Sequence, residues 1–554
     1  MANRPASLDA ATLCEALIAT AAERPDHVAL RTPDDSVSLT YDEAMERVRT
    51  LAAGLHGLGV RRGDTVGLMM VNRPGFHLFD AAAMMLGACP LSLYNTSPAE
   101  DIGYVMGDAG NTMVIAEQQF LGRLREANAH GANVETFISL DGGDDTLGIG
   151  DVVAAADDGF DFEAAWRAVE PDDLLTLIYT SGTTGPPKGV EITHANMLAE
   201  LRAVHTAVPT ASGGRQVSFL PAAHIADRWA SHYSAFMTYG NTLTSVAALP
   251  DLFGVVAQVR PTVFGAVPRV WEKLKAGLEA KGVTAETPGE QVRQMLGFDA
   301  VEWFVTGAAP TPKPLLEFFD ALGIRICEVW GMSETSCVVT TNTPEHWRPG
   351  SVGKAVEGME LRLDEDGELL VRGPLIMRGY RNQPGKTAET IDEGWLRTGD
   401  IAKVDDDDFW WIVDRKKELI INAAGKNMSP ANIEATLKSS SPLIGQAAVI
   451  GDGRSYNTAL IVLDTDFAPA WAAKQGIEDT SLEALAGQAA IREAIQKGVD
   501  EGNEKLARVE QIKKFVIVEG DWLPGGDELT PTMKLKRKPI AEKYGEKIEA
   551  MYAG

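Results

Sequence analysis

Short apolar runs alternate with longer amphipathic stretches over much of the chain, and this alternation limits the possible folds more than any other feature. Residues 65–71 (TVGLMMV) and 174–179 (LLTLIY) are two such runs, and residues 41–58 have the apolar spacing of a helix. Strands that alternate with helices are typical of βα units on a largely parallel sheet. We therefore expect an α/β fold for most of the chain.

Residues 348–400 depart from this pattern. Their short apolar segments are separated by turn sequences such as DEDG and RGP. Closely spaced strands joined by tight turns indicate an antiparallel or barrel-like subdomain. We expect this subdomain to complete the large N-terminal domain.

The chain has 554 residues, and single hydrophobic cores stop growing at about 250 to 300 residues, so more than one domain is expected. A charged run, DRKKE, follows the apolar residues 411–413. A solvated surface turn is one interpretation of such a run, and a domain boundary is the other. We place the large domain at residues 1–413, a hinge at 414–417 and a small C-terminal α/β domain at 418–554.

The net charge of −27 limits the partners that the chain can have. Nucleic acids and anionic membranes bind to basic surfaces, so we expect no nucleic-acid partner. No stretch reaches ~20 uninterrupted apolar residues, and Asp9 and Glu15 interrupt any apolar N-terminal signal, so we expect no transmembrane segment. The four scattered cysteines indicate reduced thiols in the cytoplasm. The sequence leaves two further possibilities open, a weak peripheral contact with a membrane and a homodimer.

Residues 179–189 (YTSGTTGPPKG) form the sharpest local motif and follow an apolar run directly. Glycines let the backbone approach an anion, hydroxyls and backbone N–H groups donate to phosphate oxygens, and lysine supplies a positive charge. The spacing differs from a Walker A loop, and Gly189 stands where that loop has its magnesium-binding hydroxyl. A flexible turn is the alternative. The predicted phosphate ligands are Thr180, Ser181, Gly182, Thr183, Thr184, Gly185 and Lys188.

This loop resembles the signature of the adenylate-forming superfamily, which includes acyl-CoA synthetases, peptide-synthetase adenylation domains and luciferases. The similarity extends over residues 39–43 (LTYDE), 330–334 (WGMSE), 397–400 (RTGD) and 414–415 (DR) to Lys534. The stretch after residue 414 is most similar to bacterial long-chain fatty-acid–CoA ligases. The resemblance implies ATP-dependent ligation of a fatty acid to coenzyme A through an acyl adenylate, with release of AMP and pyrophosphate. A fatty acyl-AMP ligase that loads a carrier protein is the alternative.

The resemblance assigns roles to the WGMSE motif and the residues before it. It implies that Trp330 stacks on adenine, that Gly331 and Ser333 adjoin the nucleotide, and that Glu334 binds Mg²⁺. Carboxylate oxygens are ligands that Mg²⁺ prefers. Glu328 matches a position that accepts a hydrogen bond from the adenine amino group, and a surface acid at a strand end is an equal alternative.

Three further assignments complete the implied nucleotide site. Gly307, Ala308 and Ala309 leave room for a flat base, Asp400 binds the ribose hydroxyls, and Arg415 contacts the nucleotide. Lys534 corresponds to the lysine that bridges the substrate carboxylate and the α-phosphate, although Met533 stands where glycine is frequent. The implied catalytic residues are Lys188, Glu334 and Lys534.

The resemblance also implies an acyl and coenzyme A site. His224 matches the position beside the substrate carboxylate, and Trp271 matches a tryptophan that gates a fatty-acid tunnel; a core histidine and a core tryptophan are the alternatives. Gly425 would admit the pantetheine arm, and a turn glycine is its alternative. Lys417 occupies the hinge position. The connector after Trp271 is short, which leaves the chain-length preference open.

Overall fold

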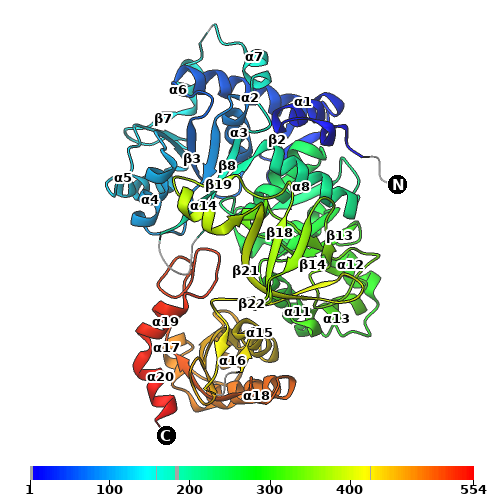
Figure 1. Ribbon diagram of the computed structural model, residues 1–554, viewed down its shortest axis with the longest axis vertical. Helices are drawn as coiled ribbons and strands as arrows, with labels where there is room; N and C mark the ends of the chain where they lie inside the picture. Colours follow the sequence, from blue (N-terminus) through cyan, green and yellow to red (C-terminus); the bar gives the residue numbers. More distant parts are fainter. Residues whose placement is uncertain (1–3, 158, 181–185, 424–425, 554) are drawn as a thin grey trace.

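The computed structural model describes residues 4–157, 159–180, 186–423 and 426–553. A large N-terminal part is joined to a smaller C-terminal part, which lies below it in Figure 1. No helix among the described residues combines the length and the apolar character that crossing a membrane requires.

The first sheet of the large part is parallel, with the strand order β4-β3-β5-β6-β7. Its strands are β3 (Thr65–Met69), β4 (Cys89–Ser92), β5 (Met113–Ala116), β6 (Thr136–Ser139) and β7 (Leu147–Gly148). The helices in this region are α2 (Tyr41–Gly57), α3 (Pro74–Met85), α4 (Ala99–Ala109) and α5 (Gln118–Asn128). Thr40 and Glu43 form a capping box that fixes the start of α2. The strand and the helix expected at 65–71 and 41–58 are confirmed.

Two more sheets complete the α/β core. Their strand orders are β10-β11-β1-β2 and β12-β13-β14-β15-β16. The strands are β1 (Val28–Arg31), β2 (Ser38–Thr40), β10 (Arg215–Ser218), β11 (Thr242–Ser245), β12 (Val263–Ala266), β13 (Trp303–Thr306), β14 (Ile326–Trp330), β15 (Thr340–Thr341) and β16 (Lys354–Ala355). Further helices are α1 (Leu13–Glu23), α8 (His194–Ala207), α10 (Leu252–Val259), α11 (Pro268–Ala280), α12 (Gly289–Leu296) and α13 (Lys313–Ala321). The parallel strands β13 and β14 end where residues 307–309 and 331–334 begin, at the edge where α/β sheets bind ligands.

The two strands that flank the phosphate motif form a hairpin. β8 (Leu174–Thr180) pairs antiparallel with β9 (Lys188–Thr193), and β19 (Gly379–Tyr380) pairs antiparallel with β9. The apolar run at 174–179 is therefore a strand, as expected, but it does not pair in parallel with its next strand. The reason is that residues 181–187, between the two strands, are too few for the crossover connection that parallel pairing requires.

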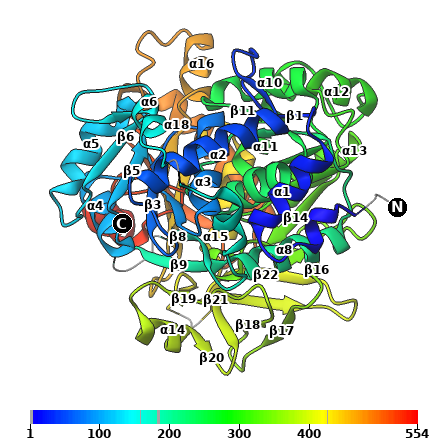
Figure 2. The ribbon, with the colours of Figure 1, turned by 90° about the horizontal axis from the view of Figure 1, so that it is seen from above.

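The subdomain expected at 348–400 is an antiparallel sheet. Its order is β17-β18-β21-β20, and β22 pairs with β21. The strands are β17 (Glu360–Leu363), β18 (Glu368–Arg372), β20 (Ile391–Asp392), β21 (Trp395–Val404) and β22 (Trp410–Arg415). Figure 2 shows this sheet and α14 (Pro384–Thr390) projecting to one side of the large part. β22 ends at Arg415, so the first two residues of the predicted hinge belong to a strand.

A buried ionic network joins α3 to the π-helix η2 (Arg228–Thr238). Asp80 forms an ion pair with Arg228, whose Nη1 lies 2.7 Å from Oδ2, and its Oδ1 accepts from His232 Nε2 at 2.8 Å; all three side chains are fully buried. His77 Nδ1 lies 2.9 Å from His232 Nδ1. Burial lowers the pKa of both histidines, so one neutral ring donates to the other. The network is fully enclosed and carries one charged pair.

The small part has its own sheet with a core on each face. β25 (Ile444–Ile450), β26 (Asn457–Leu463) and β27 (Ile512–Val518) form the sheet. The helices are α15 (Pro430–Ser440), α16 (Phe467–Lys474), α18 (Ala489–Lys505), α19 (Arg537–Lys543) and α20 (Gly545–Tyr552). One apolar cluster includes residues of α15 and α18, and a second includes residues of α19 and α20. Separate cores of this kind are typical of an independent domain.

Contacts between the two parts come from α11 and from the loop before α19. Arg269 forms an ion pair with Asp464, and Lys273 Nζ lies 2.7 Å from Asp466. The loop between β27 and α19 reaches up to the large part in Figure 1. Within it, a Cβ on Gly525 would lie only 2.4 Å from the Thr96 carbonyl oxygen. The loop therefore packs closely against the large part.

Candidate functional site

Lys188 and Glu334 lie at the two ends of a short hydrogen-bonded chain. Lys188, the first residue of β9, donates from Nζ to the Tyr380 hydroxyl at 3.0 Å, and that hydroxyl donates to Glu334 Oε1 at 2.8 Å. Burial lowers the pKa of Lys188, and the Glu334 charge opposes this effect. Glu334 is buried in the short helix η4 (Ser333–Thr335), just after β14. A half-buried cation and a buried anion are therefore held close together.

Asp400 is the centre of a second group of contacts. It pairs in register with Arg415 across β21 and β22, and the two side chains form an ion pair with Arg415 Nε 2.8 Å from Asp400 Oδ1. Trp330 Nε1 donates to the other oxygen, Oδ2, at 2.9 Å. Burial raises the pKa of Asp400, and the Arg415 charge and the Trp330 hydrogen bond oppose this. Each carboxylate oxygen can accept one more hydrogen bond, for example from a sugar hydroxyl.

Glu328 is a buried carboxyl, and the structure does not place it on the surface. Its Oε2 accepts from the Gly350 backbone N–H at 2.7 Å, and burial raises its pKa to about 8. The group is therefore largely protonated at neutral pH, so it can both donate and accept a hydrogen bond.

Small residues are required at two turns beside these carboxylates. A Cβ on Gly307 would lie 2.9 Å from Val329 Cγ2, and Ala308 has a positive φ of 68°. A Cβ on Gly331 would lie 1.5 Å from the Cys337 carbonyl oxygen. Ala309 is exposed in the first turn, and Ser333 is buried beside Glu334. Both turns keep their backbone close to the end of β14.

His224 precedes the short helix α9 (Ile225–Asp227) and caps it. Its Nδ1 accepts from the Ala226 backbone N–H at 3.1 Å, so a neutral ring carries its proton on Nε2. Burial and, to a smaller extent, the charge of Lys534 lower the pKa of His224 to about 4. His224 is therefore a neutral N–H donor near Lys534.

Lys534 comes to this region from the small domain. Its backbone N–H donates to Thr530 Oγ1 at 3.0 Å, and Met533 in the same turn has φ of 65°, a conformation that glycine adopts more easily. The surrounding protein lowers the pKa of Lys534 although part of the side chain reaches solvent, and Arg415 lowers it further. Asp400 and Glu334 act in the opposite direction. These charges share one electrostatic environment that includes groups from both domains.

Trp271 is apart from this group. It is fully buried on α11, with its ring centre 5.4 Å from that of Phe264 and 5.3 Å from that of Phe319. This packing favours the alternative of a core tryptophan, and the role of gate stays a prediction. Lys417 lies in the turn after β22.

The remaining predicted residues are at or beyond the limits of the described chain. Thr180 Oγ1 lies 3.5 Å from the Lys188 carbonyl oxygen, across the base of the hairpin. The others fall outside the described residues: Ser181, Gly182, Thr183, Thr184, Gly185 and Gly425.

Tyr380 is the residue that the sequence analysis missed. It lies far from Lys188 and Glu334 along the chain, and the pairing of β19 with β9 brings it beside Lys188. None of the motifs used in the sequence analysis contains it. The signal that could have identified it is the pairing of these strands, which the sequence does not show.

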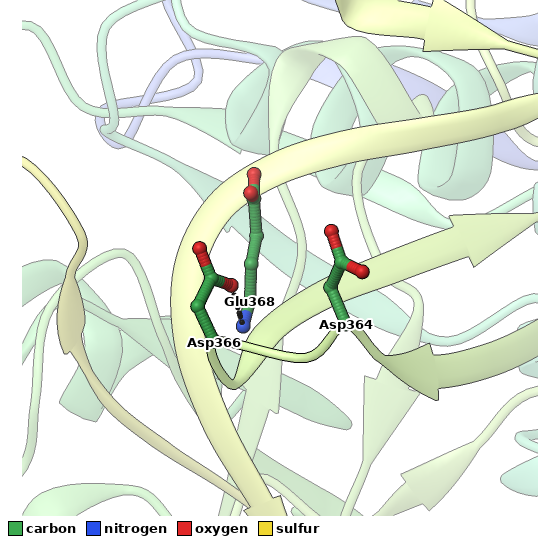
Figure 3. A group of neighbouring side chains, drawn as sticks. All are labelled: Asp364, Asp366 and Glu368. Atoms are coloured by element: carbon green, nitrogen blue, oxygen red, sulfur yellow. Dashed lines mark hydrogen bonds between the residues drawn. The ribbon is translucent and has the colours of Figure 1, made fainter.

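An acidic group on the antiparallel sheet differs from this site. Asp364, Asp366 and Glu368 point toward one another beside the turn that joins β17 to β18 (Figure 3). Lys416 Nζ lies 2.9 Å from Glu368 and is also paired with Asp366, and Arg397 lies 2.8 Å from Asp364. Each of the three carboxylates is thus already paired with a lysine or an arginine, so the group carries no metal assignment.

Comparison with known proteins identifies the class of this chain. Residues 17–381 match the sequence profile of the family described as AMP-binding enzyme, and residues 417–554 match that of the AMP-binding enzyme C-terminal domain. The chain therefore belongs to the AMP-binding enzyme family.

Named relatives and a solved structure give more detail. A Mycobacterium tuberculosis protein named as fatty-acid–CoA ligase fadD11 is 50% identical over 451 residues, which cover 74% of this chain and 79% of that protein. The long-chain-fatty-acid–CoA ligase FadD15 of Mycobacterium bovis is 34% identical over 95% of both chains. The structure of O-succinylbenzoate coenzyme A synthetase from Bacillus subtilis, in complex with ATP and magnesium ion, has a TM-score of 0.72. It is 24% identical and covers 94% of this chain and 98% of its own, which shows the shared fold.

Proposed function

We propose that this enzyme uses ATP to ligate a fatty acid to coenzyme A through an acyl adenylate, and that it prefers long-chain acids. The two relatives above, which are named as fatty-acid–CoA ligases, support the substrate class. The observation that carries the proposal is the convergence of Lys534 from the small domain with Asp400, Arg415 and Glu334 from the large one. Two cationic side chains and two carboxylates in one place suit a triphosphate and a carboxylic acid.

In the first half-reaction, a carboxylate oxygen of the fatty acid attacks the α-phosphorus of ATP. The bond from that phosphorus to the oxygen leading to the β-phosphate breaks, and pyrophosphate leaves. Lys188 and Lys534 oppose the negative charge that develops around phosphorus. Asp400 and Arg415 hold the nucleotide, and the neutral His224 offers its Nε2–H to the acid.

Glu334 fits a magnesium ligand. Its Oε1 accepts the Tyr380 hydroxyl, and a buried carboxylate oxygen is the kind of donor that a hard cation prefers. When bound, Mg²⁺ would neutralise phosphate charge. Glu334 supplies the oxygen, and Tyr380 fixes the orientation of its carboxylate.

In the second half-reaction, the thiol of coenzyme A loses its proton and sulfur attacks the acyl carbon. The bond to AMP breaks, and the products are the thioester and AMP. Lys534 stands where the thiol must approach, so the small domain has to turn. We place the hinge at Lys417, directly after β22, and assign the entry of the pantetheine arm to Gly425.

Two assays test this function together. ATP–pyrophosphate exchange and AMP release are measured with fatty acids of graded length, with and without coenzyme A. We expect exchange that depends on the fatty acid, and acyl-CoA when coenzyme A is added. Exchange without a thioester product would favour transfer to a carrier protein. Hydrolysis of ATP only to ADP, or no response to any carboxylic acid, would overturn the proposal.

A further inference from the structure

Tyr380 lies between Lys188, which is proposed to contact the phosphates, and Glu334, which is proposed to bind the metal. It accepts from Lys188 Nζ at 3.0 Å and donates to Glu334 Oε1 at 2.8 Å. The Lys188 ammonium also lies 4.1 Å from the centre of the Tyr380 ring. The hydroxyl and the ring therefore both contact the same lysine.

The direction of both hydrogen bonds follows from the chemistry of the partners. A lysine ammonium only donates hydrogen bonds and an ionised carboxylate only accepts them. The phenol oxygen therefore accepts a hydrogen bond from Lys188, and the phenol O–H donates one to Glu334.

The backbone around Tyr380 fixes the position of this hydroxyl. Tyr380 pairs with Val190 in the sheet, and its backbone N–H donates to Thr387 Oγ1 at 2.9 Å. The side chain is only 5% exposed. A buried ring on a paired strand has little freedom to turn, so the hydroxyl is a rigid element of the site.

Within the described part of the chain, Lys188 and Glu334 form no direct ion pair, and the Tyr380 hydroxyl lies between them. A direct ion pair would set each charge against the other and leave less of both for a phosphate and a hard cation. We propose that Tyr380 is a positioning residue whose hydroxyl keeps Lys188 and Glu334 apart and oriented before magnesium and ATP bind. This role rests on the proposed function in so far as ATP is the ligand.

The variant Tyr380→Phe keeps the ring beside Lys188 and removes the hydroxyl. We expect the KM for magnesium–ATP in the exchange assay to rise about ten-fold, because Lys188 and Glu334 then pair directly. The rate of thioester formation from supplied acyl adenylate should stay within about two-fold, which also shows that the variant is folded. The matched control is Tyr239→Phe, since Tyr239 is a buried tyrosine at the end of η2 whose hydroxyl lies 2.7 Å from His205 Nδ1, outside the candidate site. It should leave both values within about two-fold.

A second measurement does not depend on catalysis. Lys188 in the free enzyme is modified with an amine-specific reagent over a range of pH, and the modified peptide is quantified by mass spectrometry. In Tyr380→Phe, the direct pair with Glu334 should raise the pKa of Lys188 and move the midpoint of modification up by about one pH unit. Tyr239→Phe should keep the midpoint of the wild type.

These results separate the two proposals. An unchanged midpoint in Tyr380→Phe overturns the positioning role even if activity falls, because disturbed packing alone can lower activity. An unchanged KM for magnesium–ATP overturns it as well. If the wild type shows no exchange that depends on fatty acid, the proposed function fails, and the modification profile alone decides the role of Tyr380.

Discussion

At the scale of single residues, Lys534 should be needed for adenylation but not for thioester formation. In the proposed mechanism, its ammonium group stabilises charge at the α-phosphorus only while the small domain is in the present pose. Lys534→Ala should slow ATP–pyrophosphate exchange by about 100-fold or more and leave thioester formation from supplied acyl adenylate within about three-fold. Lys538→Ala is the control, because Lys538 is a nearby exposed lysine paired with Glu542. Equal loss in both half-reactions would contradict this division.

Glu328 should make stability depend on pH. Its folded-state pKa is about 8, whereas an unfolded glutamate titrates near 4.3, so the folded state holds a proton that the unfolded chain has lost. The stability that Glu328 contributes is complete below about pH 4 and is lost as the pH rises through about 8. Urea unfolding of wild type and Glu328→Gln should show the wild type losing up to roughly 1.4 kcal/mol more per pH unit between about pH 5 and 7.5. If the free energy of unfolding of both proteins changed with pH in the same way, this role of Glu328 would be contradicted.

The sequence predicted the residues that belong to contiguous motifs. The structure brings Lys188, Glu334, Asp400 and Arg415 into one region with Trp330, although their roles stay predictions. Tyr380 and the buried state of Glu328 could not be predicted, because both depend on which strands pair and on what covers them. Trp271 shows the same limit, since a tryptophan on a helix has the same sequence signal at a tunnel as in a core.

At the scale of elements, the network between α3 and η2 joins two segments that are distant in the chain. Asp80→Asn leaves Arg228 buried without a counter-charge and should lower the free energy of unfolding by about 3 to 5 kcal/mol. Denaturant unfolding measures this, and Glu126→Gln, an exposed change on α5, should stay within about 0.5 kcal/mol of the wild type.

The double variant Asp80→Asn with Arg228→Met tests whether this pair acts as a unit. Removing both charges takes away the unpaired cation, so its cost should be less than the sum of the two single changes. Additive costs would show that the two side chains stabilise the fold independently.

The local sequence pattern predicted helices and strands, but it did not predict which strands pair with one another. The apolar spacing of α2 and the apolar run of β3 each determine one element. For β8 the same kind of run gave the strand but not its antiparallel partner, because pairing depends on the path of the connection. Composition also could not predict that β22 ends at Arg415, because the first residues of a charged run can still belong to a strand.

At the scale of the whole molecule, two ion pairs hold the small domain against α11. Arg269 pairs with Asp464 and Lys273 with Asp466. Arg269→Ala combined with Lys273→Ala should weaken the present pose, so the adenylation rate should fall by about two- to five-fold, and high salt should produce part of this effect in the wild type. Lys275→Ala is the matched control, because Lys275 pairs within α11 with Glu279. Equal loss in the control would contradict a role for these pairs.

The position of Arg415 at the end of β22 bears on how the acyl adenylate, a reactive mixed anhydride, survives between its formation and the attack of the thiol. Arg415 and Asp400 lie side by side on the sheet of the large part, and the chain turns away only after them. A nucleotide held by this pair would stay in place while everything beyond residue 417 moves. The labile compound would thus never have to be handed over or released, and bulk water would have little opportunity to destroy it.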